Sequence, residues 1–395
     1  MPRSTSAFCN HPLHMRLVHT SPPMGPSYGG PFQSVRHLSA AQFAAGLDVQ
    51  VKMPWSAEAV AHEAAWLPVK VKVGGRILLP LLGWSPAYTR AILSSEADIL
   101  HSHGLWQHPS WVSLDWKKQY KRPHVCSVRG MLEPWAWAHN AWKKRPVWWL
   151  WERRNLQTAS LLHATSIQEA EALRARGLRA PIAVIPNGVV LPDRFELSRP
   201  LLQESLGKIA LYLSRIHPKK GLPLLLEAWA KVRPEDWSLH IVGPDESGHR
   251  ADLERLGSKL GLGGLVIFSD ALAGEAKARA FRESSLFILP SHSENFGIAV
   301  AEALSYGLPV ITTHGTPWSM LESERCGWWV PTRVDGLAAA LDDASSRSGA
   351  ALAAMGERGR EMVASRFAWD GIAQQFIDCY RWILGQVPKP DCVIS

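Results

Sequence analysis

Two carboxylates, Glu294 and Glu302, stand eight residues apart in a segment that reads SHSENFGIAVAE from residue 291 to residue 302. Glu294 follows the apolar run Leu286–Leu289, which predicts a buried strand. Glu302 lies about two turns into a helix that is expected to begin near Phe296–Gly297, so both carboxylates can face one pocket at the carboxyl end of that strand. Free N–H groups at the start of a helix favour anionic oxygens. The segment therefore predicts a site for a ligand that carries both hydroxyls and anionic groups.

Fixed positive charge is expected in a second strand-to-helix turn, Ser214–Gly221, which reads SRIHPKKG. This turn precedes a helix predicted over Leu222–Val232. Arginine meets phosphate oxygens with a planar fork, whereas lysine acts as a point charge. Two solvated basic residues in a loop are the alternative interpretation. The nearby carboxylates favour a diphosphate site that uses Arg215 and Lys220.

Bulk properties indicate a globular chain of more than one domain. A length of 395 residues is too great for one compact core, and the apolar content of 46% and charged content of 20% exclude a disordered protein. A run of about 18 uncharged apolar residues is missing from the sequence, which argues against a transmembrane helix. Scattered cysteines without a C-x-x-C pair argue against a disulfide frame or zinc site and favour a reducing, cytoplasmic compartment; they are Cys9, Cys126, Cys326, Cys379 and Cys392.

Short apolar runs alternate with helical patterns, which is typical of parallel βαβ units. We expect two Rossmann-like doubly wound α/β domains, at residues 15–190 and 191–368, with ligands at the carboxyl ends of their strands. A terminal helix is expected in residues 369–395. Residues 1–14 are interpreted as a disordered tail or a mis-started N-terminus. The predicted strands lie near 16–20, 48–53, 98–101, 124–128, 160–164 and 182–185, and then near 209–213, 238–242, 265–268, 286–289 and 308–312.

The two turns together resemble the nucleotide-sugar site of the retaining GT-B glycosyltransferases, in particular the glycosyl transferases group 1 family (family 4). The resemblance implies two Rossmann-like domains that face each other across a cleft, with the last helix crossing back to the first domain. It also implies that Glu302 accepts hydrogen bonds from the ribose hydroxyls and that Glu294 contacts the transferred sugar. The amides of Asn295, Phe296 and Gly297 would bind sugar and phosphate oxygens. The alternative for Glu302 is an ordinary glutamate on a helix surface.

The resemblance covers roughly residues 16–385 and is weaker on the acceptor side. A loop with paired glycines, Gly29 and Gly30, follows the first strand and allows a close backbone approach. His103 lies where the strand near residue 98 is expected to end, and it is a candidate to bind hydroxyls or exchange protons. Many family members place a histidine near the position of Arg129, so this sequence departs from the pattern there. Arg129 is a candidate to bind a phosphate of donor or acceptor instead.

The implied reaction retains the anomeric configuration, and its catalysis rests on stabilising the leaving diphosphate. The candidate catalytic residues are Arg215, Lys220, Glu294 and His103. The sequence contains no Asp-x-Asp pair, the usual metal-binding motif of GT-A transferases. We therefore expect no essential metal and no cofactor beyond the nucleotide-diphosphate sugar that serves as donor.

A basic, tryptophan-rich segment occupies residues 115–154. The segment contains ten Lys or Arg residues and three acidic residues, so its net charge is +7 in a chain whose net charge is +8. Tryptophan favours the membrane interface and basic side chains favour anionic lipids, so peripheral contact with the inner face of the plasma membrane is predicted. The alternative is that the tryptophans pack in the core. Nucleic acid is disfavoured, because a basic patch without a binding motif is non-specific.

The favoured function is transfer of a sugar to a bacterial cell-surface polysaccharide or lipid-linked glycan, as in lipopolysaccharide and exopolysaccharide assembly. This interpretation rests on the resemblance of residues 103–106 and 129–135 to the polysaccharide-assembly members of the family. A sugar-nucleotide 2-epimerase of the same fold is one alternative, and it would need no acceptor. A non-catalytic sugar-nucleotide binder at the membrane surface is the other.

Overall fold

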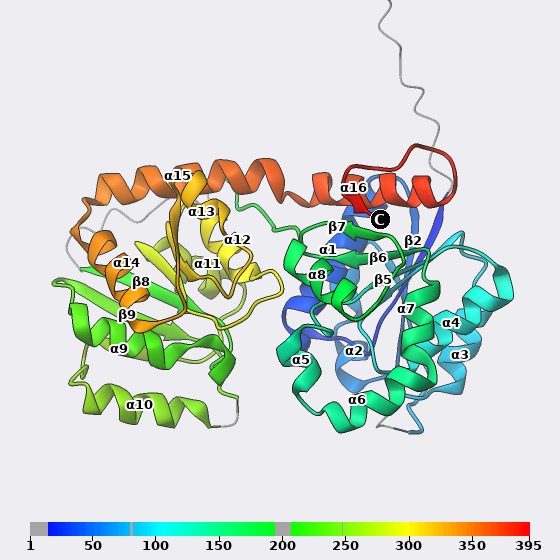
Figure 1. Cartoon of the computed structure of the whole chain (residues 1–395), viewed down its shortest axis with the longest axis horizontal. Coiled ribbons are helices and arrows are strands. Elements are labelled where there is room, and N and C mark those ends of the chain that lie inside the picture. The colour runs from blue at the N-terminus through cyan, green and yellow to red at the C-terminus, as the bar shows by residue number, and fades with distance from the viewer. Residues whose placement is uncertain (1–14, 80–81, 194–206, 247) are drawn as a thin grey trace, which may run out of the picture. The chain divides into compact units, whose positions relative to one another are not determined.

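The computed structural model describes residues 15–79, 82–193, 207–246 and 248–395, and its contacts divide the chain into two α/β units (Figure 1). The first unit contains the chain up to Ala164, then Ala170–Ile185 and Ala373–Ser395. The second unit contains Thr165–Glu169 and Pro186–Ile372. The predicted tail at residues 1–14 and most of the polar stretch before Gly207 lie outside the described residues.

The first unit is built on an eight-stranded sheet in the order β14-β7-β6-β5-β4-β1-β2-β3. Its strands are parallel, except that β14 pairs antiparallel with β7. The strands are β1 Arg16–Thr20, β2 Asp48–Pro54, β3 Lys70–Gly74, β4 Ile99–His103, β5 His124–Ser127, β6 Leu161–Ala164, β7 Ile182–Val184 and β14 Val393–Ile394. The helices are η1 Pro26–Tyr28, α1 Gly30–Ala44, α2 Ala57–Ala61, η2 Glu63–Trp66, α3 Pro86–Leu93, α4 His108–Tyr120, α5 Pro134–Ala138, α6 Ala141–Val147, η3 Trp148–Glu152, α7 Arg153–Thr158 and α8 Ile167–Ala175.

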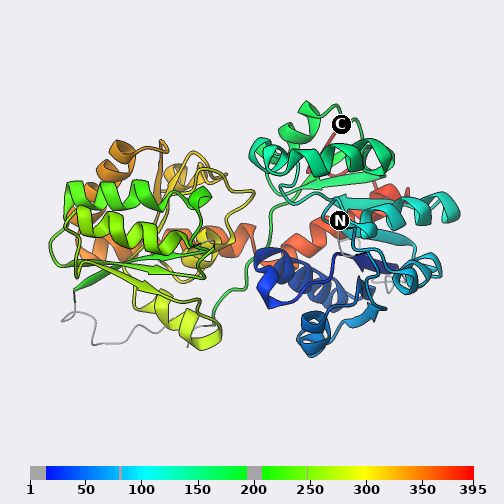
Figure 2. The same ribbon diagram turned by 90° about the horizontal axis from the view of Figure 1, so that it is seen from below.

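The second unit has a six-stranded sheet in the order β10-β9-β8-β11-β12-β13, all parallel. Helices cover both faces of this sheet (Figure 2). The strands are β8 Lys208–Leu213, β9 Trp237–Val242, β10 Val266–Ser269, β11 Leu286–Leu289, β12 Val310–Thr313 and β13 Gly327–Val330. The helices are η5 Pro218–Lys220, α9 Leu222–Val232, α10 His249–Lys259, α11 Gly274–Arg282, α12 Ile298–Ser305, α13 Met320–Ser323, α14 Val334–Ser346, α15 Gly349–Arg366 and α16 Trp369–Ile383, whose later residues belong to the first unit.

Hydrophobic patterning explains why these segments fold as they do. Every residue of β11 is buried, as expected for a central parallel strand that is covered on both faces. Helix α9 buries Leu222, Leu225, Leu226 and Trp229, an i, i+3, i+4, i+7 stripe that packs into the core of the second unit. Across the described residues, no helix combines the length and apolarity needed to span a membrane.

The predicted fold class of doubly wound α/β units is confirmed. The sequence analysis missed three strands: β3, whose lysines alternate with valines, β13 and the two-residue β14. It was also wrong about β4, which continues to His103 instead of stopping near residue 101. This buried strand can contain polar residues because the side chains of His101, Ser102 and His103 are all hydrogen-bonded.

Candidate functional site

The strand order of the second unit reverses between β8 and β11, and doubly wound folds bind ligands beyond the carboxyl ends of strands at this switch point. Lys220 follows β8 and Glu294 follows β11. Lys220 Nζ lies 2.5 Å from Glu294 Oε1. Their side chains are only 10% and 13% exposed. Two predicted site residues therefore form a nearly buried ion pair across the switch point.

Further hydrogen bonds hold Glu294 in place. Ser291 Oγ donates to the same carboxylate oxygen at 2.6 Å, and the Glu294 amide donates to the carbonyl of Gly315 at 2.7 Å. Burial by itself would raise the pKa of Glu294, but the Lys220 ammonium and the two side-chain hydrogen bonds bring it below its ordinary value. An ionised carboxylate in this position can accept hydrogen bonds from sugar hydroxyls.

Close backbone packing shapes the two turns. Gly221 has φ of +69°, and a Cβ there would lie 2.1 Å from the carbonyl oxygen of Pro290, so the β8 turn needs glycine at this point. Gly297 caps α12 with φ of +81°. Beneath it, the buried Trp318 donates from Nε1 to the Phe296 carbonyl at 2.5 Å. The loop that carries the predicted amides is therefore held over a tryptophan.

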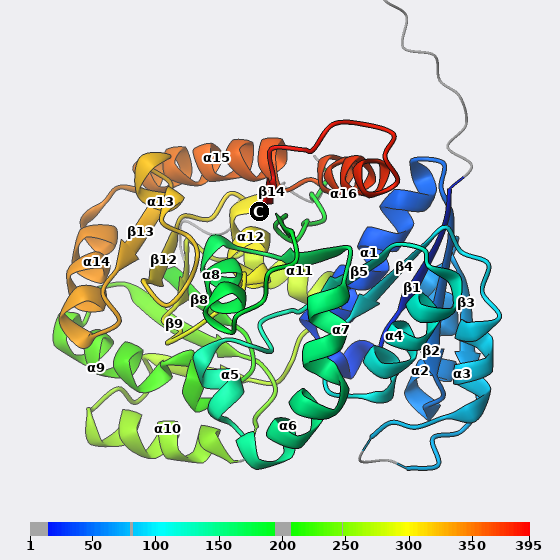
Figure 3. The same ribbon diagram turned by 45° about the vertical axis from the view of Figure 1, so that its right-hand side comes forward.

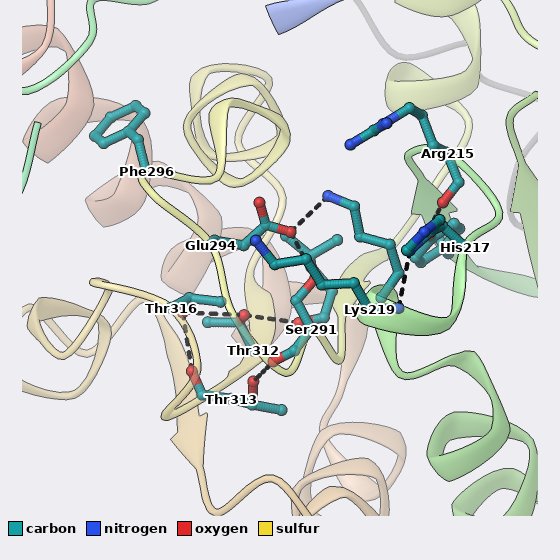
Figure 4. Close-up of polar contacts among 12 residues, drawn as sticks. Arg215, His217, Lys219, Ser291, Glu294, Phe296, Thr312, Thr313 and Thr316 are labelled. Atoms are coloured by element: carbon teal, nitrogen blue, oxygen red, sulfur yellow. Dashed lines mark hydrogen bonds and ion pairs between the residues drawn. The ribbon is translucent and has the colours of Figure 1, made fainter. Parts of the chain in front are cut away.

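Arg215 and Glu302 form ion pairs with residues that the sequence analysis did not identify. Arg215 Nη1 lies 2.7 Å from Glu246 Oε1, and the Arg215 side chain is 58% exposed. Figure 4 shows Arg215 on a separate segment from Glu294. Glu302 Oε1 lies 2.6 Å from Lys277 Nζ of α11. Glu246 follows β9, the neighbour of β8, so strand adjacency was the only available signal for it, and Lys277 had none.

The side chain of Asn295 has an unsatisfied buried atom. Its side-chain oxygen is buried and has no hydrogen-bond partner among the residues that the structure describes. A buried acceptor without a donor is costly. A hydroxyl or amide of a bound ligand would satisfy it; the predicted role of the amides of the segment Asn295–Gly297 stays a prediction.

The glycine loop of the first unit lies at the carboxyl end of β1, beside the switch point between β1 and β4. Gly29 has φ of +64° and caps α1, and Gly30 is the first residue of that helix. No atom lies within 4 Å of where a Cβ of Gly29 would be. Glu58 holds the loop by accepting from the Ser27 amide at 2.7 Å and the Ser27 hydroxyl at 2.5 Å. Glu58 was not identified from the sequence.

His103 is fully buried and begins a chain of hydrogen bonds. Arg129 donates from Nη2 to His103 Nδ1 at 3.0 Å, and because arginine only donates, His103 must carry its proton on Nε2. His103 Nε2 is 2.8 Å from His19 Nδ1, and His19 Nε2 is 2.7 Å from Gln42 Oε1. The Gln42 amide then donates to the hydroxyl of Tyr380 on α16 at 3.1 Å. Each donor thus determines the next acceptor.

The hydrogen-bond chain continues from Tyr380 to the backbone of Ile185, also in the first unit. The Tyr380 hydroxyl is 2.7 Å from His101 Nδ1, and His101 Nε2 is 2.7 Å from Ser127 Oγ. Ser127 Oγ is 2.7 Å from His163 Nδ1, and His163 Nε2 is 2.7 Å from the carbonyl of Ile185. That carbonyl only accepts, so both ends impose the same direction. All four histidines are therefore neutral, with the proton on Nε2.

Burial keeps these imidazoles uncharged. It lowers the pKa of His19 to about 4 and that of His163 to about 3, and it lowers the pKa of His101 and His103 well below the ordinary value. Both ring nitrogens of the buried His103 are engaged, Nδ1 by Arg129 and Nε2 by His19. The sequence analysis named His103 as a candidate to bind hydroxyls or exchange protons; in the structure its ring nitrogens are occupied by protein partners.

Three of these imidazoles also form the candidate metal cluster among the described residues. The ligand atoms of His19, His101 and His103 lie within 4.8 Å of one another. Every ring nitrogen of the three already takes part in the hydrogen-bond chain, and the Arg129 cation contacts His103. The arrangement favours hydrogen bonding over a bound cation.

Comparisons with known proteins agree with this geometry. The model described as Glycosyltransferase Family 4 matches residues 28–191, and that described as Glycosyl transferases group 1 matches residues 193–362. A GDP-mannose:cellobiosyl-diphosphopolyprenol alpha-mannosyltransferase of Xanthomonas campestris is 26% identical over 388 residues, which are 94% of this chain and 98% of the relative. A D-inositol 3-phosphate glycosyltransferase of Streptomyces scabiei is 28% identical, with 93% of this chain and 90% of the relative covered.

Solved structures show the same fold. Anabaena HepE in complex with UDP superposes with a TM-score of 0.75 at 20% identity, covering 94% of this chain and 100% of that one. Sucrose-phosphate synthase from Thermosynechococcus elongatus gives a TM-score of 0.74 at 21% identity, with the same coverage. The chain therefore belongs to family 4 of the GT-B glycosyltransferases, the glycosyl transferases group 1 family.

Proposed function

We propose that this protein is a retaining glycosyltransferase that moves a sugar from a nucleotide-diphosphate sugar to a bacterial cell-surface polysaccharide or lipid-linked glycan. The observation that carries the proposal is the Lys220–Glu294 pair at the switch point of the second unit. Lys220, Arg215 and the N-terminus of α12 neutralise the departing diphosphate. Glu294 binds the transferred sugar.

Two of the proposed donor residues already have ion-pair partners in the structure. Arg215 releases Glu246 to meet a phosphate, which is inexpensive because the pair is largely exposed. Glu302 accepts from the ribose hydroxyls while it keeps Lys277, since a carboxylate has several acceptor sites. The amides of the segment Asn295–Gly297 complete the donor site.

On the acceptor side, we propose that Arg129 binds a phosphate and that His103 positions it. The acceptors in the names of two relatives, cellobiosyl-diphosphopolyprenol and D-inositol 3-phosphate, both carry phosphate. Arg129 is held by His103 and by Ser34 Oγ, to which Nη1 donates at 2.7 Å. The left-handed backbone of Arg129, with φ of +57°, is a strained conformation of the kind found at functional sites. Gly29 and Gly30 would line the acceptor side of the proposed site together with Arg129.

We further propose that transfer needs no metal and no added cofactor, and that the protein works in the cytoplasm at the inner face of the membrane. The missing Asp-x-Asp pair supports the first point. Exposed aromatic side chains in the segment 115–154, among them Trp142 and Trp149, support the contact with the membrane.

A thermal-shift panel tests the donor site. The protein is mixed with UDP, GDP, ADP or CMP, or with their sugar conjugates, in the presence and absence of EDTA. A ligand at 100 times its Kd stabilises the folded protein by about 2.7 kcal/mol. We expect a shift with one nucleoside diphosphate that is unchanged by EDTA, lost in Lys220→Ala and kept in the control Lys231→Ala. If none of the ligands shifts the transition, the proposed donor site is wrong. Product analysis without acceptor then separates transfer from 2-epimerisation, since only an epimerase converts the sugar nucleotide alone.

A further inference from the structure

An amphipathic helical segment runs along the first unit, outside the site described above. Helices α6, η3 and α7 follow one another without a break from Ala141 to Thr158 (Figure 3). One face is buried and includes Trp148 and Trp151. The opposite face leaves Trp142 72%, Trp149 71% and Leu150 74% exposed. The tryptophans of this segment are therefore divided between a buried face and an exposed face of the same helix.

The exposed face carries basic residues and no exposed acid. Four exposed cations accompany the apolar side chains: Lys143, Arg145, Arg153 and Arg154. The only acid between residues 141 and 158 is Glu152, which is fully buried and accepts from the Trp106 amide, Ser110 and Asn155. The positive charge of this face is therefore not neutralised by its own helix.

A depression of about 880 Å³ opens beside this face. Its lining includes Trp149, Arg153 and Arg154 from the helical segment, and Arg174 and Arg179 from the end of α8 and the turn into β7. The two walls are joined by Gln157, whose side chain donates to the Gly177 carbonyl at 2.7 Å and accepts from the Arg179 amide at 3.2 Å. Four arginines thus converge on one hollow.

Two of these arginines have side-chain contacts that involve no carboxylate. Arg174 donates from Nη1 to the carbonyls of Leu178 and Ala180, at 2.9 and 2.8 Å, and the Arg153 guanidinium lies 5.3 Å from the centre of the Trp149 ring. None of the ion pairs formed within the described part of the chain includes any of the four arginines, or the nearby Glu171 of α8. Arginine forks of this kind suit phosphate oxygens.

We propose that this hollow binds the phosphate of an anionic phospholipid headgroup, while Trp142, Trp149 and Leu150 enter the interface of the bilayer. The apolar side chains beside the charge favour a lipid surface over a soluble anion, because tryptophan partitions to the interface and leucine to the acyl boundary. The proposal depends on the membrane contact within the proposed function but not on the transfer reaction.

The hollow is separate from the acceptor-side residues of the same unit. Gln157 and Arg179 precede β6 and β7, so they lie near the amino ends of these strands. His103 and Arg129 lie at or after the carboxyl ends of β4 and β5, which is the opposite edge of a parallel sheet. A lipid headgroup in the hollow is therefore a docking contact and not the sugar acceptor.

Vesicle co-sedimentation of the full chain tests the proposal. Vesicles of phosphatidylcholine alone are compared with vesicles that also contain phosphatidylglycerol, with and without excess inorganic phosphate. Near an anionic surface each basic residue contributes about fivefold to partitioning. We expect binding only to the anionic vesicles, loss of about 25-fold in Arg153→Gln/Arg154→Gln, and little competition by inorganic phosphate.

The matched control is Lys70→Gln/Lys72→Gln, which removes the same charge from exposed positions of β3 at the other end of the sheet. Equal weakening by the two pairs would overturn the proposal, as would equal binding to neutral vesicles or full displacement by inorganic phosphate. The nucleotide thermal shift, measured on the same variants, reports the donor site independently. Vesicle binding that responds to Arg153 and Arg154 without any nucleotide shift would leave the docking site standing while the proposed reaction fails.

Discussion

Lys220→Ala should destabilise the second unit strongly, because it leaves the buried carboxylate of Glu294 without its ion-pair partner. Glu294 keeps its burial and its hydrogen bond from Ser291, but loses the ammonium at 2.5 Å. Removing one partner of a buried ion pair costs about 3–5 kcal/mol, whereas an exposed pair contributes less than about 1 kcal/mol. With side-chain exposures of 10% and 13%, this pair belongs to the buried class. We expect a loss of about 3 kcal/mol.

The pH dependence follows from the two opposing influences on Glu294. In the natural protein its folded pKa is lowered, so its contribution is present above the unfolded value and is lost as pH falls through the folded value. Without Lys220, burial is the largest influence left, so we expect the pKa of Glu294 in the folded variant to rise above its unfolded value. The folded variant then takes up a proton as pH falls from 7. The stability difference between the two proteins should therefore narrow toward low pH.

Scanning calorimetry without ligand measures the effect. For a domain of this size each kcal/mol moves the melting temperature by about 2–4 °C, so Lys220→Ala should melt roughly 6–12 °C lower at pH 7. The control is Lys231→Ala, whose pair with Asp335 leaves the two side chains 60% and 75% exposed. Adding Glu294→Gln to Lys220→Ala should recover part of the loss. Equal shifts in Lys220→Ala and Lys231→Ala, or a gap that does not narrow with pH, would refute the reasoning.

Two predictions concern the histidine chain of the first unit. Tyr380→Phe deletes the hydroxyl that accepts from Gln42 and faces His101, so we expect a loss of about 1–3 kcal/mol in calorimetry, with nucleotide binding unchanged; an unaltered melting temperature would contradict the directed chain. Stability should also fall as pH decreases from about 6.5 toward 4, because His19 and His163 stay neutral when folded and take up protons when unfolded. Urea unfolding across this pH range measures the slope, and a flat profile would show that these histidines are protonated in the folded state.

Local sequence was enough to predict most of the fold. The buried run of β11, the apolar stripe of α9 and the turn that contains Gly221 are each encoded by neighbouring residues, through hydrophobic spacing and backbone freedom. Strand β3 was missed because it contains no continuous apolar run. Its lysines and valines alternate, as expected for a strand at the end of the sheet with one face toward solvent. Strand β4 was predicted too short because its histidines do not read as buried residues.

The sequence could name candidate residues of the site, but it could not predict which residues they would pair with. The family of the chain and the candidate donor residues were both inferred from two short motifs, since binding a phosphate and a sugar needs basic and acidic groups in strand-to-helix turns. Their pairing does not follow, because Lys220 meets Glu294 and Glu302 meets Lys277 only after distant segments pack. A hydrogen-bond partner depends on three-dimensional position, and sequence spacing carries little information about it.

The amino-acid sequence by itself thus determined the two doubly wound units, the family and the strand-to-helix turns that carry the candidate donor residues, since all of these depend on local patterns. Only the tertiary structure decided which tryptophans face solvent, because a helix buries one side and Trp148 and Trp149 fall on different sides of it. It also decided the direction of the histidine chain, which joins strands, α1 and α16 between an obligate donor and an obligate acceptor. Such a chain exists only when residues far apart in sequence are brought within hydrogen-bonding distance.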